Sequence, residues 1–174
     1  KYNTNEGESY EFSLGLNGLG ACAAQYSSEY MDVEVRRDGF RYTLHFEHGE
    51  NIGGLKKEPY AKKDTGTVIR FKPDIQVFTD IQIPADYFRD ILRRQAIVNP
   101  NLLFLLRLPE GRGFKTEEFL YRNGIADYVR ELAGDDAMTD VQVWTAERKG
   151  RDRADKPEYR VKLNVAMCVS NKHN

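Results

Sequence analysis

The sequence predicts an α+β fold in which most strands pair antiparallel. Asp38-Gly39 lies between two strand-like segments, which is the pattern of a tight two-residue hairpin. Apolar residues at helical spacing follow Pro84, and a strictly alternating apolar segment runs from residue 159 to residue 169. Hairpins interspersed with amphipathic helices therefore indicate a mixed α+β architecture.

The composition is that of a folded globular protein. The 174 residues suit one domain, or one and a part, with 40% apolar and 30% charged residues. No run approaches the roughly 18 apolar residues of a membrane span, and no signal peptide opens the chain. Cys22 and Cys168 lack metal-site spacing and predict reduced thiols. We therefore expect a cytoplasmic protein that makes no contact with a membrane.

The net charge of −1 argues against a basic nucleic-acid module. The charged cluster at residues 148–153 contains an acid, and both a solvated loop and a weak DNA contact remain open for it.

The first half of the chain predicts one helix followed by strands. Small residues after Gly18 favour a short helix, and Val33 and Val35 alternate with charged residues as in a strand. The returning strand follows Gly39, and Pro73 stops a later one. The expected ranges are a helix at 18–30, strands at 31–36 and 40–46, an irregular connection with a short strand at 50–65, and a strand at 67–71.

The second half predicts two helices around a hairpin. Pro84 fits the first turn of a helix that reaches about Val98. Its apolar face is expected to hold Tyr87, Phe88, Ile91, Leu92 and Gln95. The continuous apolar run 102–108 predicts a strand covered on both faces, which turns back at 110–113 into a strand at 116–121. A further helix is expected at 125–133, closed by Gly134.

A long two-stranded ribbon is expected at 141–148 and 159–169. Its apolar face should turn toward a core and its polar face toward solvent. The apolar set is Val161, Leu163, Val165, Met167 and Val169, and the polar set is Arg160, Lys162 and Asn164. Gly134-Asp135-Asp136 breaks the preceding helix, so we expect a domain border between 136 and 142, with domains at 1–138 and 139–174.

The glycine-rich stretch 15–20 is the strongest single indication of a ligand. Its three glycines leave backbone N–H groups unobstructed, and the alanine-rich run behind them favours a helix. A helix N-terminus carries a partial positive charge and attracts phosphate. Most glycine-rich turns are only turns, so the spacing by itself is a weak signal.

A dinucleotide-binding site is an alternative interpretation of this stretch. Gly18, Gly20 and Ala23 match that fingerprint, and Asp38 stands 20 residues after Gly18. The fingerprint also needs a parallel strand and a crossover helix after the acid, but an antiparallel strand follows Asp38 directly. We therefore interpret Asp38 as a hairpin residue.

Four segments in order are similar to one known family. They are Ser9 to Ala21, Val33-Glu34-Val35-Arg36-Arg37-Asp38-Gly39, Phe46-Glu47-His48-Gly49, and Asp64-Thr65-Gly66-Thr67-Val68-Ile69-Arg70-Phe71. Together they resemble the family of GHKL ATPases formed by the B subunits of DNA gyrase and topoisomerase IV. A weaker likeness continues through residues 123–129 and on toward the end of the chain.

The resemblance implies the C-terminal half of a GHKL (Bergerat) ATP-binding sandwich, followed after residue 138 by the first strands of a transducer domain. It places Lys1 and Tyr10 in an ATP lid, a glycine motif around the triphosphate, and Thr67 near the adenine. Arg37 matches the rim of the pocket that binds aminocoumarin inhibitors. The implied ATP-binding residues are Lys1, Tyr10, Gly15, Leu16, Asn17, Gly18, Leu19, Gly20, Ala21 and Thr67.

Three positions depart from the family's pattern. Asn17 stands where histidine is usual, Glu11 where lysine is usual, and Leu14 where glycine is usual. An acid beside a triphosphate is unfavourable, so Glu11 puts side-chain contacts with phosphate in doubt. These departures indicate a divergent member of the family.

By resemblance, the parent protein is an ATP-dependent type II DNA topoisomerase of a bacterial cytoplasm. It would need Mg²⁺, a catalytic A-type subunit and duplex DNA, and ATP binding would dimerise it. The family's magnesium-binding and catalytic residues belong before Lys1, so we expect neither in this chain and no ATP hydrolysis by the chain alone. A GHKL chaperone or mismatch-repair clamp, and a nucleotide-independent interaction domain, are the alternatives. The sequence does not distinguish gyrase from topoisomerase IV.

Overall fold

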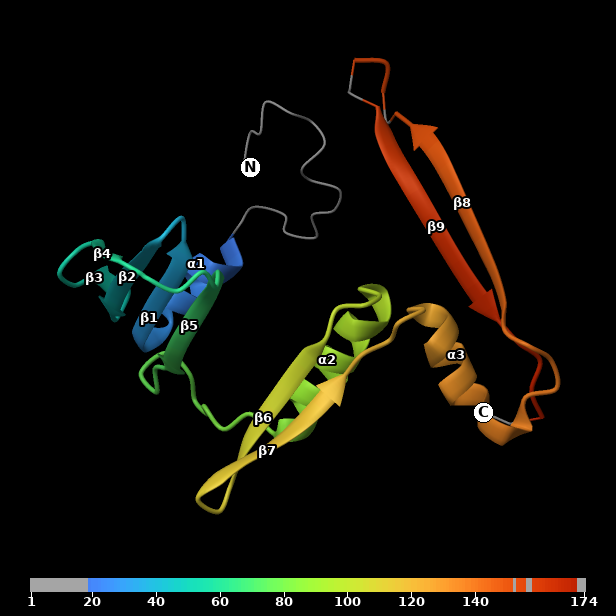
Figure 1. Ribbon diagram of the computed structural model, residues 1–174, viewed down its shortest axis with the longest axis horizontal. Helices are drawn as coiled ribbons and strands as arrows, with labels where there is room; N and C mark the ends of the chain where they lie inside the picture. The colour runs from blue at the N-terminus through green and yellow to red at the C-terminus, as the bar shows by residue number, and fades with distance from the viewer. Residues whose placement is uncertain (1–18, 152, 156–157, 172–174) are drawn as a thin grey trace. The chain divides into compact units, whose positions relative to one another are not determined.

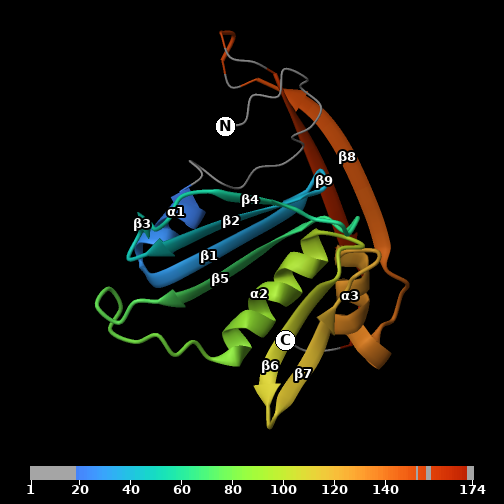
Figure 2. The same cartoon turned by 60° about the vertical axis from the view of Figure 1, so that its left-hand side comes forward.

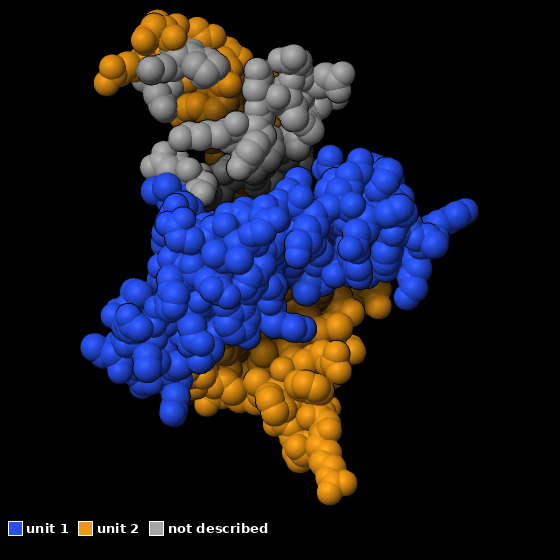
Figure 3. Space-filling view, turned by 90° about the vertical axis from the view of Figure 1, so that its left-hand side faces the viewer, with its two compact units in different colours: residues 1–82 blue, residues 83–174 orange. Residues whose placement is uncertain are grey.

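A computed structural model describes residues 19–151, 153–155 and 158–171. The chain divides into two compact units, residues 1–82 and residues 83–174. Figure 3 colours these units separately.

In residues 19–82, unit 1 consists of one helix and one antiparallel sheet (Figures 1 and 2). The strand order is β3-β2-β1-β5, and β4 pairs with the other end of β2. The elements are α1 (Leu19–Tyr26), β1 (Ser28–Arg37), β2 (Phe40–Glu47), β3 (Glu50–Asn51), β4 (Lys56–Pro59) and β5 (Gly66–Pro73). The three predicted long strands are thus confirmed. The predicted helix is present but ends at Tyr26 instead of near Tyr30, because residues 28–30 pair within the sheet as the start of β1.

The predicted hairpin at Asp38-Gly39 is confirmed. Both residues have positive φ, 54° and 75°, and Arg37 pairs with Phe40 across the turn. Two successive positive φ angles are what a tight hairpin needs to match the strand twist, and Asp and Gly tolerate them. This turn therefore sets the register of β1 against β2.

Two serine side chains at the junction of α1 and β1 donate hydrogen bonds to the last turn of the helix. Ser27 donates from Oγ to the carbonyl of Ala23 at 2.7 Å, and Ser28 donates to that of Ala24 at 2.5 Å. The carbonyl of Ala23 also accepts the backbone N–H of Ser27 at 3.0 Å, so the serine hydroxyls add to the bonding of the last helical turn. Ser28 and Met31 are both buried and anchor the start of the sheet.

Unit 2 consists of two hairpins and two α-helices. Ala96, Ile97 and Tyr121 form its small core, with Phe104, Phe119, Ile125 and Tyr128 packed around them. The elements are α2 (Ala85–Val98), β6 (Phe104–Glu110), β7 (Gly113–Phe119), α3 (Ile125–Ala133), the short 3-10 turn η1 (Gly134–Asp136), β8 (Gln142–Gly150) and β9 (Tyr159–Met167).

Helix α2 begins after Pro84 as predicted, but the predicted apolar face is wrong. Tyr87 is 58% exposed, whereas Ala96 and Ile97 are buried. Phe88, Ile91 and Gln95 are also exposed, and only Leu92 of the predicted set is partly covered. Hairpin β6–β7 and helix α3 contact the other side of α2 (Figure 2). On that side, Arg89 of α2 binds Glu117 of β7.

The two other burial predictions in this unit are also corrected. Strand β6 alternates between half-buried and exposed side chains, because hairpin β6–β7 has α2 on one face; Leu105 is 51% exposed. The ribbon β8–β9 is confirmed, with Val165 opposite Trp144. Its apolar face, however, is exposed: Val161, Leu163, Val165, Met167 and Val169 are each 40–56% accessible. No described element covers that face.

Helix α3 ends at Gly134 as predicted, where φ is 54° and the backbone N–H donates to the carbonyl of Arg130. The predicted domain border near residue 138 lies just beyond this turn and stays a prediction. Among the described residues, no helix is long and apolar enough to cross a membrane.

Candidate functional site

Part of the predicted ATP site falls within the described residues. Leu19, Gly20 and Ala21 form the first turn of α1, Thr67 lies on β5, and Arg37 ends β1. The remaining predicted site residues lie outside the described residues: Lys1, Tyr10, Gly15, Leu16, Asn17 and Gly18, together with the departures Glu11 and Leu14.

The first turn of α1 is open to solvent. Leu19 is 64% exposed, and a Cβ atom added to Gly20 would meet nothing within 4 Å. The turn carries no acidic side chain that could repel an anion. The first N–H groups of a helix have no partner within the helix itself, so this end can offer donors to a phosphate or other anion.

The sheet register brings Thr67 and Arg37 to one face of unit 1. Thr67 stands directly opposite Val35, and residues opposite each other in an antiparallel pair share a face. Arg37 is two residues beyond Val35 on β1, so it points to that face as well. Val33 opposite Ile69 continues this face as an apolar surface. The sequence motifs identified Thr67 and Arg37 as site residues independently of each other, and the fold places both on the same face of the sheet.

Arg37 lies at the mouth of a cavity at the hairpin end of the sheet. Its side chain is 68% exposed and forms an ion pair with Asp38 at 3.3 Å. An exposed pair of this kind contributes little stability, so a ligand can take the place of Asp38. The cavity has a volume of about 340 Å³ and is lined by Arg37, Asp38, Gly39 and the segment from Tyr60 to Thr65.

A second hollow, of about 320 Å³, lies on the opposite, charged face of the same sheet. In it, His45 Nδ1 lies 2.7 Å from Asp32 and Nε2 lies 3.2 Å from Glu47. The hydrogen bond with Asp32, and then that with Glu47, raises the pKa of His45. No sequence motif identified His45 as a site residue. The hairpin at Asp38-Gly39 was the signal that could have revealed this contact, because its register pairs His45 with Asp32.

His48 also has a carboxylate partner. Its Nδ1 lies 2.8 Å from Oδ2 of Asp74, which is buried. The backbone N–H of Gln76 donates to the other oxygen of Asp74, and this bond chiefly lowers the pKa of Asp74, with His48 contributing. The Asp74 carboxylate therefore has a hydrogen-bond partner at each oxygen, which fits a structural role at the end of β5.

Across the described ranges, no three His, Cys, Asp or Glu side chains are grouped so that they could hold a metal ion. We therefore assign Mg²⁺ to none of these side chains.

Comparison with known proteins gives a consistent set of relatives. No family model matches the chain. The B subunit of DNA gyrase from Synechocystis is 32% identical over 94% of this chain and 15% of its own length. The B subunit of DNA topoisomerase 4 from Enterococcus faecalis is 32% identical over 81% of this chain and 21% of its own length. The chain thus spans only a minor part of these curated relatives.

One solved structure is similar in fold along most of the chain. It is the 43K ATPase domain of Thermus thermophilus gyrase B in complex with an aminocoumarin. The TM-score is 0.70 at 27% identity, over 90% of this chain and 40% of that structure. This likeness confirms the predicted fold class.

Proposed function

The chain belongs to the family of DNA gyrase and topoisomerase IV B subunits, and from this we propose that it is part of the ATP-binding and DNA-gating B subunit of a type II DNA topoisomerase. The observation that carries the proposal is the 32% identity along 94% of the chain. The fold supports it, because the similar structure is an ATPase domain. In the parent protein, ATP binding would drive passage of one DNA duplex through another.

The chain's own residues would hold one side of the nucleotide. The N–H groups at the start of α1, with the glycine motif that precedes them, would bind phosphate oxygens. Thr67 would contact the adenine from β5, beside the apolar surface of Val33 and Ile69. Arg37 would lie at the rim, where an aminocoumarin would contact it; the similar Thermus structure contains such a compound.

The complete protein would need groups that the described residues do not supply. We propose that Mg²⁺ is held by other parts of the protein, and that a catalytic A-type subunit, duplex DNA and a second copy of the same chain are its partners. We further propose a cytoplasmic location, with residues 1–138 in the ATPase domain and residues 139–174 in the transducer domain.

A calorimetric titration of ATP into the full-length protein tests the nucleotide site. Thr67→Val removes the hydroxyl and keeps the shape, so we expect ATP affinity to fall by roughly fivefold to tenfold. Thr116→Val is the matched control and should bind normally, because Thr116 is an exposed threonine on β7, outside the predicted site. Normal binding by Thr67→Val would remove Thr67 from the site, and no binding by the wild type would favour a nucleotide-independent interaction domain.

Strand passage separates the topoisomerase from other ATPases of the same fold. With an A-type subunit, the full-length protein should change the linking number of a circular plasmid only when ATP is present. ATP hydrolysis without any change in linking number would favour a chaperone or a mismatch-repair clamp.

The 174-residue chain alone should show no turnover in a phosphate-release assay and weak ATP binding in a calorimetric titration. Turnover near the parent's rate would show that its catalytic residues lie within this chain.

A further inference from the structure

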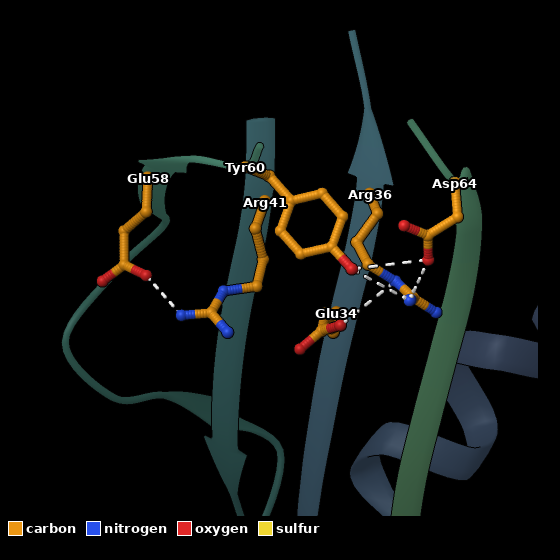
Figure 4. Close-up of polar contacts among 6 residues, drawn as sticks. All are labelled: Glu34, Arg36, Arg41, Glu58, Tyr60 and Asp64. Atoms are coloured by element: carbon orange, nitrogen blue, oxygen red, sulfur yellow. Dashed lines mark hydrogen bonds and ion pairs between the residues drawn. The ribbon is translucent and has the colours of Figure 1, made fainter. Parts of the chain in front are cut away.

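Arg36 holds the segment between β4 and β5 against strand β1. Its Nη1 donates to Oδ2 of Asp64 at 2.5 Å and to the hydroxyl of Tyr60 at 3.4 Å (Figure 4). The Tyr60 hydroxyl in turn donates to the same oxygen of Asp64 at 3.4 Å. The guanidinium carbon also lies 5.9 Å from the centre of the Tyr60 ring. One arginine thus contacts both ends of the segment 60–64.

The side chain of Arg36 is less exposed to solvent than that of the neighbouring Arg37. The side chain of Arg36 is 25% exposed, against 68% for Arg37, and its Nε lies 3.3 Å from Glu34. The hydrogen bond with Tyr60 chiefly raises the pKa of Arg36, and the charge of Asp64 adds to this. An arginine side chain is already charged at neutral pH, and these contacts favour its charged form further.

The anchored segment leads directly to Thr67. Arg36 stands opposite Gly66 in the sheet, and a Cβ atom added to Gly66 would lie 3.6 Å from Nη2 of Arg36. Thr67 is the next residue along β5. The position of the Thr67 side chain therefore depends on a strand start that Arg36 secures.

The same segment carries two exposed lysines to the cavity mouth. Lys62 and Lys63 line the 340 Å³ cavity together with Arg37. They lie between Tyr60 and Asp64, the two residues that Arg36 holds. If that hold were lost, the lysines would no longer be kept beside Arg37.

We propose that Arg36 is a positioning residue of the nucleotide site, which sets the start of β5 for Thr67 and holds Lys62 and Lys63 at the cavity mouth. This proposal rests on the proposed function for its effect on ATP. Its structural part, the anchoring of residues 60–64, can be measured without any nucleotide.

Strand β2 offers a matched control. Arg41 stands directly opposite Arg36 in the hairpin and donates from Nη2 to Glu58 on β4 at 2.5 Å (Figure 4). It is the same residue type on the same face with an equally short carboxylate contact. It secures β4, where Lys56 and Lys57 lie, and makes no contact with Asp64 within the described structure.

Limited trypsin digestion of the full-length protein, followed by mass spectrometry, tests the anchoring. Arg36→Met should speed cleavage after Lys62 and Lys63 by roughly fivefold or more and leave cleavage after Lys57 unchanged, because only the anchored segment opens. Arg41→Met should show the reverse pattern. Arg36→Lys should protect Lys62 and Lys63 in part, because an ammonium can still pair with Asp64. Equal effects of Arg36→Met and Arg41→Met at both positions, or none, would overturn the anchoring.

ATPase kinetics of the full-length protein test the positioning. Arg36→Met should raise the KM for ATP severalfold with a smaller change in kcat. The reason is that Thr67 is proposed to contact the adenine and not the reacting phosphate, so its displacement should weaken ATP binding more than it slows the reaction. Tyr60→Phe is a milder variant and should show a smaller rise. Faster cleavage at Lys62 with an unchanged KM would overturn the positioning role while leaving the proposed function intact. Absence of ATP binding by the wild type would refute the proposed function and leave the digestion result standing.

Discussion

Arg89 on α2 donates two hydrogen bonds to Glu117 on β7, from Nε and Nη2 to the two carboxylate oxygens, each at 2.7 Å. This parallel geometry is the strongest form of an arginine–carboxylate pair. Both side chains are partly covered, at 34% and 22% exposure. The pair joins the helix to the hairpin and explains which side of α2 is covered.

Loss of this pair should weaken unit 2 in a pH-dependent way. The hydrogen bond with Arg89 chiefly lowers the pKa of Glu117 from its ordinary 4.5. The contribution of the Arg89–Glu117 pair to stability is therefore complete above pH 4.5 and is lost as the pH falls through the lowered pKa of Glu117. Glu117→Gln should lower the melting temperature at neutral pH by a few degrees, with the difference shrinking in acid. The exposed neighbour Glu118→Gln is the control, and an equal loss in both variants would contradict the pair's role.

The inhibitor-rim assignment of Arg37 predicts a loss of drug binding. In the full-length protein, Arg37→Ala should weaken aminocoumarin binding by roughly tenfold to a hundredfold, since a charge-assisted hydrogen bond contributes about 1.5–3 kcal/mol. Arg112→Ala is the matched control, because Arg112 is an exposed arginine in another two-residue hairpin turn, between β6 and β7. Unchanged affinity of Arg37→Ala in a calorimetric titration would remove the assignment.

His45 should titrate above the ordinary histidine value of 6.5. Hydrogen bonds with Asp32 and Glu47 favour its charged form, so its contribution to stability is complete below pH 6.5 and is lost as the pH rises through the raised value. Asp32→Asn should return the pKa of His45 toward 6.5 and flatten this part of the stability profile. Two-dimensional NMR of the imidazole nitrogens measures the pKa of His45 in the wild type and in Asp32→Asn. A wild-type pKa at or below 6.5 would contradict the hydrogen-bonded geometry.

Two glycines in nearly the same backbone conformation should differ in their tolerance of a side chain. Gly124 has φ 55° and ψ −125°, and Gly134 has φ 54° and ψ −139°. A Cβ atom at Gly124 would lie 3.0 Å from the carbonyl oxygen of Ile97, whereas at Gly134 it would meet nothing within 4 Å. Gly134→Ala should cost about 1–3 kcal/mol in backbone strain, and Gly124→Ala distinctly more. Chemical denaturation of the two variants measures this, and equal losses would show that the contact relaxes freely.

Local chemistry made several elements predictable from the sequence. The hairpin at Asp38-Gly39 and the helix end at Gly134 depend on φ angles that those residues adopt readily, so neighbouring sequence was sufficient. The period-two pattern from Tyr159 likewise identified β9. Burial was not predictable in this way: the covered side of α2 depends on where β6–β7 packs, and the exposed apolar face of β8–β9 has no described partner.

The residues of the candidate site could be identified without any structure. Thr67 and Arg37 came from ordered motifs that resemble a known family, and no contact was needed to identify them. That both share one face could be seen only in the folded chain, because it depends on the pairing of β1 with β5, which are distant in the sequence. The tertiary structure alone also brought Arg36 to Tyr60 and Asp64, which lie 24 and 28 residues away. Such contacts form between residues far apart in the sequence, so no local pattern encodes them; they exist only once the strands have paired in register.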